Sequence, residues 1–139
     1  MSPGPVIIID DDEDDKEMLE EIITELEIPN QILWFTKTDD AFEYLITTST
    51  QPFIIFSDIN LPGDSGLNFK KLIDDDPALK KKSIPFVFFS TAADPITVNE
   101  VYSKMTVQGY FQKPNSYNET KEIVRLIIEY WRVCKHPNS

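Results

Sequence analysis

The fold of this chain is decided by residues 57–66 (SDINLPGDSG), which follow the apolar run 53–56 (FIIF). The run is short and rich in β-branched and aromatic residues, which is typical of a strand buried on both faces. The turn residues Pro62 and Gly63 indicate that this strand ends near Asp58. A carboxylate is therefore expected where a buried strand reaches solvent, and open parallel sheets bind ligands at this edge.

The composition predicts one domain, residues 1–139, with a core at about 6–134. The chain carries 24 acidic and 13 basic residues, a net charge of −11, which argues against direct nucleic-acid binding because a phosphate backbone would be repelled. Its single cysteine, Cys134, excludes an internal disulfide and favours a reducing, cytoplasmic setting. Residues 1–5 lack the features of a signal peptide, and no apolar run has the roughly 18–20 residues of a membrane span.

Hydrophobic patterning predicts alternating strands and helices. Besides 53–56, the predicted strands are 6–9, 31–35, 86–89 and 109–112. Apolar residues at helical spacing predict five helices, at about 18–26, 41–46, 67–73, 98–105 and 117–134. This alternation predicts an α/β fold, a parallel sheet covered by helices on both faces and joined by right-handed crossovers.

Four of the predicted strands are followed by side chains that carry a charge or a hydroxyl group. The carboxyl ends of parallel strands lie at one edge of the sheet, so these side chains are expected to converge. They are Asp10 and Asp11 after the first strand, Asp58 after the third, Ser90 and Thr91 after the fourth, and Lys113 after the fifth.

This set of residues predicts phosphoryl chemistry. Carboxylates at one edge would repel one another unless a cation lay among them, and hard oxygen ligands suit Mg²⁺. Lys113 adds a fixed positive charge, and Ser90 adds a hydroxyl donor. Asp58 would then act as a nucleophile toward phosphorus, while the cation and Lys113 neutralise the charge that develops in the transition state.

Four motifs occur in a fixed order along the chain. They are 7–11 (IIIDD), 58–63 (DINLPG), Pro85 five residues before Ser90, and 109–114 (GYFQKP). Together they resemble the response-regulator receiver domain of two-component signalling, of the single-domain chemotaxis type, over about residues 6–134. The resemblance implies a flavodoxin-like three-layer fold with five helices and a five-stranded parallel sheet of order 2-1-3-4-5.

The resemblance also implies roles for individual residues. Asp58 is similar to the phosphoacceptor, and Lys113 is similar to the lysine that contacts the phosphoryl group. Asp10 and Asp11 resemble the acidic pair that binds Mg²⁺ together with Asp58, and Asn60 resembles the residue that offers its backbone carbonyl oxygen to the metal.

Two further positions resemble the switch residues of the family. Ser90 matches the switch hydroxyl, and Thr91 takes that role if the strand is shifted by one residue. Tyr110 matches the switch aromatic residue. The bond before Pro114 is expected to be cis, as is usual in the family and accessible to proline. Asp64 is an additional carboxylate that departs from the common pattern.

The implied function is a response regulator that receives a phosphoryl group from a histidine kinase or a histidine phosphotransfer protein. Beyond its own phosphorylation and dephosphorylation, no enzymatic turnover is expected. Nothing after Cys134 is long enough for an output domain. The output is therefore expected to pass through an unknown downstream protein, unless the chain is a fragment, and a monomer or weak dimer is expected.

Three alternatives remain open. A Mg²⁺-dependent phosphohydrolase with an aspartate nucleophile would need an acid two residues later, where this chain has Asn60. An interaction module of the same fold would work without phosphorylation. Asp10, Asp12, Asp14 and Glu21 have the spacing of EF-hand ligands, but Asp15 stands where that loop requires glycine.

Some charged residues have a simpler interpretation. Residues 12–15, all acidic, are predicted to be a solvated block that caps a helix. Lys70, Lys71 and residues 80–82 are predicted to form a solvated face. His136 is predicted to lie in a polar tail.

Overall fold

The computed structural model describes residues 4–138, so the predictions that fall on residues 1–3 and on Ser139 lie outside the described residues. The strands are β1 (Val6–Ile9), β2 (Ile32–Phe35), β3 (Ile54–Ser57), β4 (Phe86–Ser90) and β5 (Gly109–Gln112). The helices are α1 (Glu13–Glu25), α2 (Thr38–Thr47), α3 (Gly66–Asp75), α4 (Pro77–Lys82), α5 (Pro95–Lys104) and α6 (Tyr117–Val133). None of the helices described is long and apolar enough to cross a membrane.

The predicted number of helices is wrong by one, since residues 4–138 contain six. The additional helix is α4, in a segment between the predicted third helix and fourth strand where no helix was predicted. Three features stabilise this short helix of 6 residues. Pro77 opens it, the Asp76 side chain accepts a hydrogen bond from Leu79 N at 3.0 Å, and the Leu79 side chain is buried.

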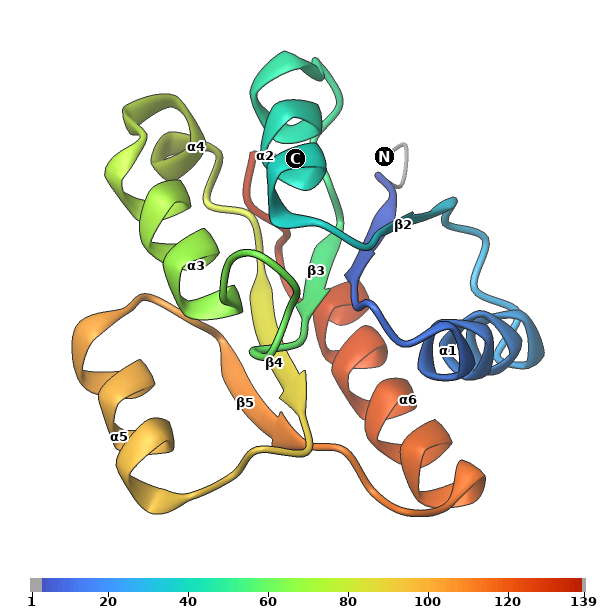
Figure 1. Cartoon of the computed structure of the whole chain (residues 1–139). Coiled ribbons are helices and arrows are strands. Elements are labelled where there is room, and N and C mark those ends of the chain that lie inside the picture. The colour runs from blue at the N-terminus through green and yellow to red at the C-terminus, as the bar shows by residue number, and fades with distance from the viewer. Residues whose placement is uncertain (1–3, 139) are drawn as a thin grey trace.

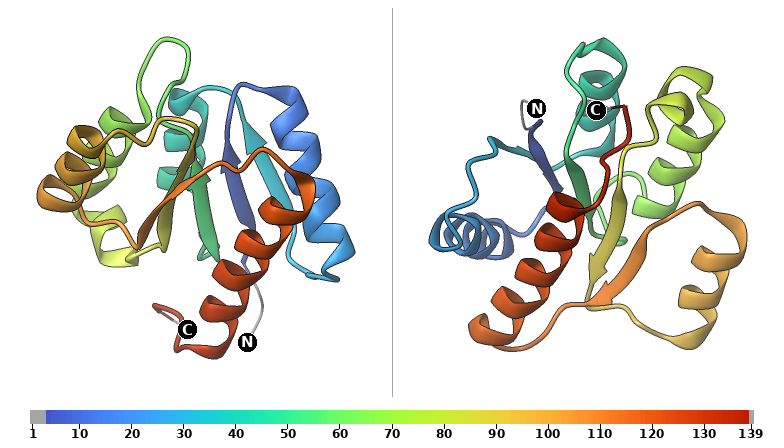
Figure 2. Two further views of the ribbon diagram at one scale, coloured as in Figure 1. Left: turned by 90° about the horizontal axis from the view of Figure 1, so that it is seen from below. Right: turned by 180° about the vertical axis from the view of Figure 1, so that it is seen from behind.

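The five strands are parallel in the order β2-β1-β3-β4-β5, which confirms the predicted flavodoxin-like topology. Figure 2 shows three layers, with α1 and α6 on one face of the sheet and the other helices on the opposite face. Ile9 pairs with both Phe35 and Ser57, so β1 ends level with its two neighbours. The carboxyl ends of the strands therefore form one continuous edge (Figure 1).

Alternate side chains of the sheet enter two apolar clusters. Val6, Ile8 and Phe56 pack under α1 and α6, and Ile7 and Ile55 pack under α2, α3 and α5. All are at least 98% buried, as expected for a parallel sheet covered on both faces.

The prediction of a solvated lysine face is wrong for Lys70. Its side chain is 6% exposed, and its ammonium group lies 2.6 Å from the carboxylate of Asp74, one helical turn away. The same ammonium group lies 5.2 Å from the centre of the Phe86 ring. The four-carbon stem explains the error, because it crosses apolar surface before the charge finds its partner.

The prediction of a polar tail around His136 is also wrong. The residue is 8% exposed and its ring stacks on Phe53 with the centroids 5.2 Å apart. Its Nε2 atom lies 2.6 Å from the carbonyl oxygen of Phe53, just before β3. Asn138 donates to the carbonyl oxygen of Lys82 at 2.7 Å. The segment after α6 therefore packs against the amino edge of the sheet, opposite the site described next.

Candidate functional site

The backbone hydrogen bonds of the sheet extend one residue beyond the strands and position three of the predicted site residues. Asp10 N donates to Phe35 O at 3.1 Å, Asp58 N to Ile9 O at 2.9 Å, and Lys113 N to Ser90 O at 2.8 Å. Each of these residues directly follows the last residue of a strand, so its position is fixed by the rigid sheet. Such positions suit groups that must be held in exact mutual geometry.

The ammonium group of Lys113 joins three carboxylates. Its Nζ atom lies 2.6 Å from Asp10 Oδ2, 2.8 Å from Asp15 Oδ2 and 3.0 Å from Asp58 Oδ2. The exposed fractions of the four side chains are 9% for Lys113, 4% for Asp10, 14% for Asp58 and 34% for Asp15. An ammonium group has three hydrogens, so this arrangement uses all of them.

Burial and charge act against each other in this cluster. Burial raises the pKa of Asp10, and the bonds from Lys113 and from Asp12 N lower it only in part. Burial alone would lower the pKa of Lys113, but its hydrogen bonds to Asp10 and Asp15 and the charge of Asp58 outweigh burial and hold that pKa above its usual range. Lys113 is therefore a permanent cation near neutral pH.

Two of the predicted metal ligands, Asp10 and Asp58, contact the same ammonium group. Asp11 and Asn60 are exposed residues beside them in sequence. Among residues 4–138, no three His, Cys, Asp or Glu side chains are grouped as a metal site. The donors nonetheless suit Mg²⁺, because Asp10 and Asp58 already share one cation and offer only hard oxygen atoms.

Asp15 is a site residue that the sequence interpretation missed. The prediction of a solvated, capping acid is right for Asp12, whose side chain accepts from Asp14 N and Asp15 N at the start of α1. It is incomplete for Asp15, which lies partly exposed in the first turn of α1 but also contacts Lys113. The missed signal is helical spacing, because Asp15 is four residues before the buried Leu19 and so lies on the inner face of α1.

The predicted switch residues are Ser90 at the end of β4, Thr91 on the loop that follows, and Tyr110 on β5. Ser90 is fully buried, and its hydroxyl oxygen accepts from Ala92 N at 3.2 Å, whereas Thr91 is exposed. The Tyr110 hydroxyl donates to the carbonyl oxygen of Ala92, and burial raises its pKa. Tyr110 N donates to the hydroxyl of Tyr102 on α5 at 2.9 Å. Loop, edge strand and helix are thus connected through Tyr110.

The expected cis bond before Pro114 is not found, since none of the described residues has a cis peptide bond. The Lys113–Pro114 bond is therefore trans, which is the favoured isomer even before proline.

The loop after Asp58 is closed at its base. Gly66 N donates to Ile59 O at 2.8 Å, and a Cβ atom at Gly66 would lie 2.1 Å from the carbonyl oxygen of Asp58. Asp64, the additional carboxylate, accepts bonds from Ser65 N at 2.9 Å and from the Asn68 side chain at 2.8 Å. It therefore helps to begin α3 and does not join the Lys113 cluster.

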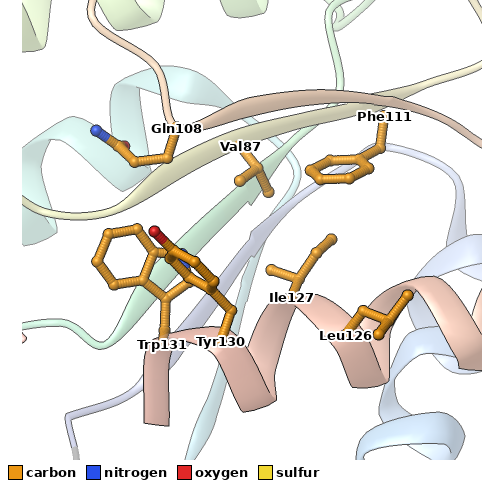
Figure 3. A pocket seen from close by; sticks show the side chains of 7 residues that line it. All are labelled: Val87, Gln108, Phe111, Leu126, Ile127, Tyr130 and Trp131. Atoms are coloured by element: carbon orange, nitrogen blue, oxygen red, sulfur yellow. The ribbon is translucent and has the colours of Figure 1, made fainter. Parts of the chain in front are cut away.

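A separate apolar groove of about 320 Å³ lies between β5 and α6 (Figure 3). Phe111 and Val87 form its sheet side, and Ile127 and Trp131 lie on the helix opposite. Tyr130 is 62% exposed at its rim. The groove contains none of the predicted site residues. This face of α6 therefore presents an apolar surface that is separate from the charged carboxyl edge of the sheet.

Comparison with known proteins establishes the class. The model of the response regulator receiver domain matches residues 6–125, and the chain belongs to this family. The DNA-binding transcriptional regulator NtrC of Proteus hauseri is 27% identical over 139 residues, which are the whole of this chain but 28% of NtrC.

Solved structures agree on the fold. The phosphorylated cyanobacterial phytochrome response regulator RcpA superposes with a TM-score of 0.87 at 24% identity, covering 99% of this chain and 100% of RcpA. The Mn²⁺-bound form of response regulator Rcp1 gives a TM-score of 0.85 at 23% identity, covering 97% of this chain and 99% of Rcp1.

Proposed function

We propose that this receiver domain accepts a phosphoryl group from a phosphohistidine donor onto Asp58 and thereby changes a protein-binding face. The observation that carries the proposal is the bridge of Lys113 between Asp10 and Asp58, two carboxylates from neighbouring strand ends. A nucleophile, a fixed cation and an acidic group at one sheet edge are the parts that aspartyl-phosphate chemistry needs.

The transfer is an in-line displacement at phosphorus. A carboxylate oxygen of Asp58 forms the new P–O bond, and the P–N bond to the donor histidine breaks, with its electron pair leaving on the imidazole nitrogen. Asp10, Asp11, Asp58 and the Asn60 carbonyl oxygen would hold Mg²⁺, which when bound neutralises charge on the phosphoryl oxygens. Lys113 remains protonated and donates to one of those oxygens. The Mn²⁺-bound form of Rcp1 supports a divalent cation here.

The signal would leave through the loop after β4. Ser90, or Thr91 beside it, would donate to a phosphoryl oxygen and draw the loop inward. This movement disturbs the bond between the Tyr110 hydroxyl and Ala92 O, and Tyr110 also contacts α5 through Tyr102. The face formed by α5, β5 and α6 would change, and a downstream protein that prefers the changed face would read it.

The proposed partners are a histidine kinase or a histidine phosphotransfer protein in the cytoplasm, and an unidentified downstream protein. No separate substrate turnover is proposed. NtrC binds DNA, but this chain spans only 28% of it, and the net charge of −11 opposes direct DNA contact.

The test is intact mass after incubation with acetyl phosphate, with Mg²⁺ or with a chelator. The wild type should gain one phosphoryl group only with Mg²⁺, and Asp58→Asn should gain none while its circular dichroism spectrum is unchanged. Asp64→Asn is the matched control, because Asp64 lies in the same loop but outside the Lys113 cluster. Labelling of Asp58→Asn would overturn the assignment of Asp58. No labelling of the wild type, even by a kinase that labels other receivers, would favour an interaction module.

A further inference from the structure

The contact between Asp15 and Lys113 leads beyond the roles already assigned. Asp15 is the third residue of α1, and no strand end holds it. Its carboxylate nevertheless lies 2.8 Å from the Lys113 ammonium group, closer than the 3.0 Å contact of Asp58. Asp15 thus accepts one of the three hydrogen bonds that the Lys113 ammonium group can donate, and the proposed reaction requires this lysine.

The three contacts of Lys113 are not equivalent. Asp10 and Asp58 belong to the proposed metal and phosphoryl site, whereas Asp15 reaches the lysine from α1. Asp15 is 34% exposed, so it is the partner in closest contact with water. Removal of its charge therefore leaves the strand ends unchanged and alters only the neutralisation and the orientation of Lys113.

The charge of Asp15 acts at short range on the reacting group. Its Oδ2 atom and Asp58 Oδ2 lie within about 6 Å of each other, because both contact the same nitrogen atom. At this separation a carboxylate attracts a metal cation and repels an incoming phosphoryl group. The same charge should thus have opposite effects on the two ligands of the site.

We propose that Asp15 is a positioning residue that holds Lys113 from α1 and sets the charge of the site, favouring divalent cation binding and opposing phosphoryl transfer. This inference rests on the proposed function. In the unphosphorylated state Lys113 is saturated by three carboxylates. When a phosphoryl group is attached to Asp58, the lysine exchanges its Asp58 contact for a phosphoryl oxygen, while Asp10 and Asp15 keep the ammonium group in place.

The chain offers a matched pair of variants, Asp15→Asn and Asp14→Asn. Both remove one negative charge from the first turn of α1, but Asp14 is exposed and is not a partner of Lys113. A general effect of net charge would appear in both. Asp15→Glu restores the charge with a longer side chain, and it should return both measured quantities toward the wild-type values.

Metal affinity can be read without phosphorylation. Trp34 donates from its indole nitrogen to the carbonyl oxygen of Asp10 at 2.7 Å, so its fluorescence reports on this edge of the sheet. The other tryptophan, Trp131, is replaced by phenylalanine in every protein tested. Mg²⁺ is then titrated against the fluorescence of each variant.

In Asp15→Asn, Mg²⁺ affinity should fall and the rate of labelling by acetyl phosphate at saturating Mg²⁺ should rise, each by about three- to tenfold for a partly exposed charge. Asp14→Asn should leave the Mg²⁺ affinity and the labelling rate close to their wild-type values, each changed by less than about 1.5-fold. Equal shifts in the two variants, or a fall of both quantities in Asp15→Asn, would overturn the role of Asp15. If the wild type is not labelled, the proposed function fails, and the Mg²⁺ titration alone still decides for or against Asp15.

Discussion

Two lysines with largely buried side chains, Lys70 on α3 and Lys113 at the carboxyl edge of the sheet, illustrate two ways of placing a charge inside this protein. Lys70 pairs with Asp74 on its own helix, four residues away, and its side chain is 6% exposed. Lys113 is 9% exposed and pairs with carboxylates that lie 55, 98 and 103 residues away in sequence. Both ammonium groups are neutralised, but only Lys113 holds separate elements together.

The difference shows what each ion pair can do. The Lys70 pair forms whenever α3 forms, so it reports only on the local helix. The Lys113 cluster exists only when the ends of β1, β3 and β5 and the start of α1 are assembled. The cluster has three carboxylates and only one ammonium group, so it carries excess negative charge. It can therefore respond to an added cation or anion.

The largest effect expected is that of Lys113→Met. Loss of the ammonium group leaves Asp10, Asp15 and Asp58 facing one another, and we expect the free energy of unfolding to fall by about 2–4 kcal/mol in a chelator. Saturating Mg²⁺ should recover most of this loss, because it supplies the missing positive charge. Urea unfolding with and without Mg²⁺ measures both values. A loss of the same size in both conditions would show that the carboxylates do not share a cation.

A smaller and pH-dependent effect is expected for Asp10→Asn. Because burial raises the pKa of Asp10 above 3.8, the folded protein binds more protons at this residue than the unfolded chain just above pH 3.8. The contribution of Asp10 to stability therefore falls as the pH rises through that window, and the ionised group remains a cost at higher pH.

Asp10→Asn should thus be more stable than the wild type at pH 7 in a chelator. This advantage should shrink as the pH falls toward 3.8. The measurement is the midpoint of urea unfolding from pH 7 to pH 3.5. A variant that is less stable than the wild type at pH 7 would mean that the bond to Lys113 outweighs the burial of Asp10.

The smallest effect is expected for Lys70→Met, which tests the local pair. Methionine fills a similar volume beside Phe86, and Asp74 is 24% exposed and can be solvated, so the loss should be about 1 kcal/mol or less. It should not depend on Mg²⁺, and acetyl phosphate labelling should match the wild type. Any dependence on Mg²⁺ would show that the two lysines belong to one electrostatic network.

The sequence was sufficient for the sheet and for the centre of the site. Most of the strands are apolar runs, and parallel strands end at one edge of the sheet, so the convergence of Asp10, Asp58 and Lys113 could be predicted from the pattern. The strand order itself was predicted from the resemblance to receiver domains. Their roles in phosphoryl transfer remain predictions, as do those of Ser90, Thr91 and Tyr110.

The sequence was insufficient where a partner comes from another element. The contact of Asp15 with Lys113 depends on how α1 leans over the edge of the sheet, and that of His136 depends on the turn after α6. Composition marks both residues as polar and therefore as exposed. Their partners, the ammonium group of Lys113 and the carbonyl oxygen of Phe53, can be identified only from the packed structure.

The loop after Asp58 is closed at its base, so its length can vary without moving Asp58. The bond from Gly66 N to Ile59 O, and the close approach of Gly66 to the Asp58 backbone, fix both ends of the loop. An insertion after Gly63, at the exposed tip, would lengthen the excursion and leave Asp58 where it is. Evolution can therefore add recognition surface beside the phosphoacceptor without disturbing the chemistry, as long as position 66 has no side chain.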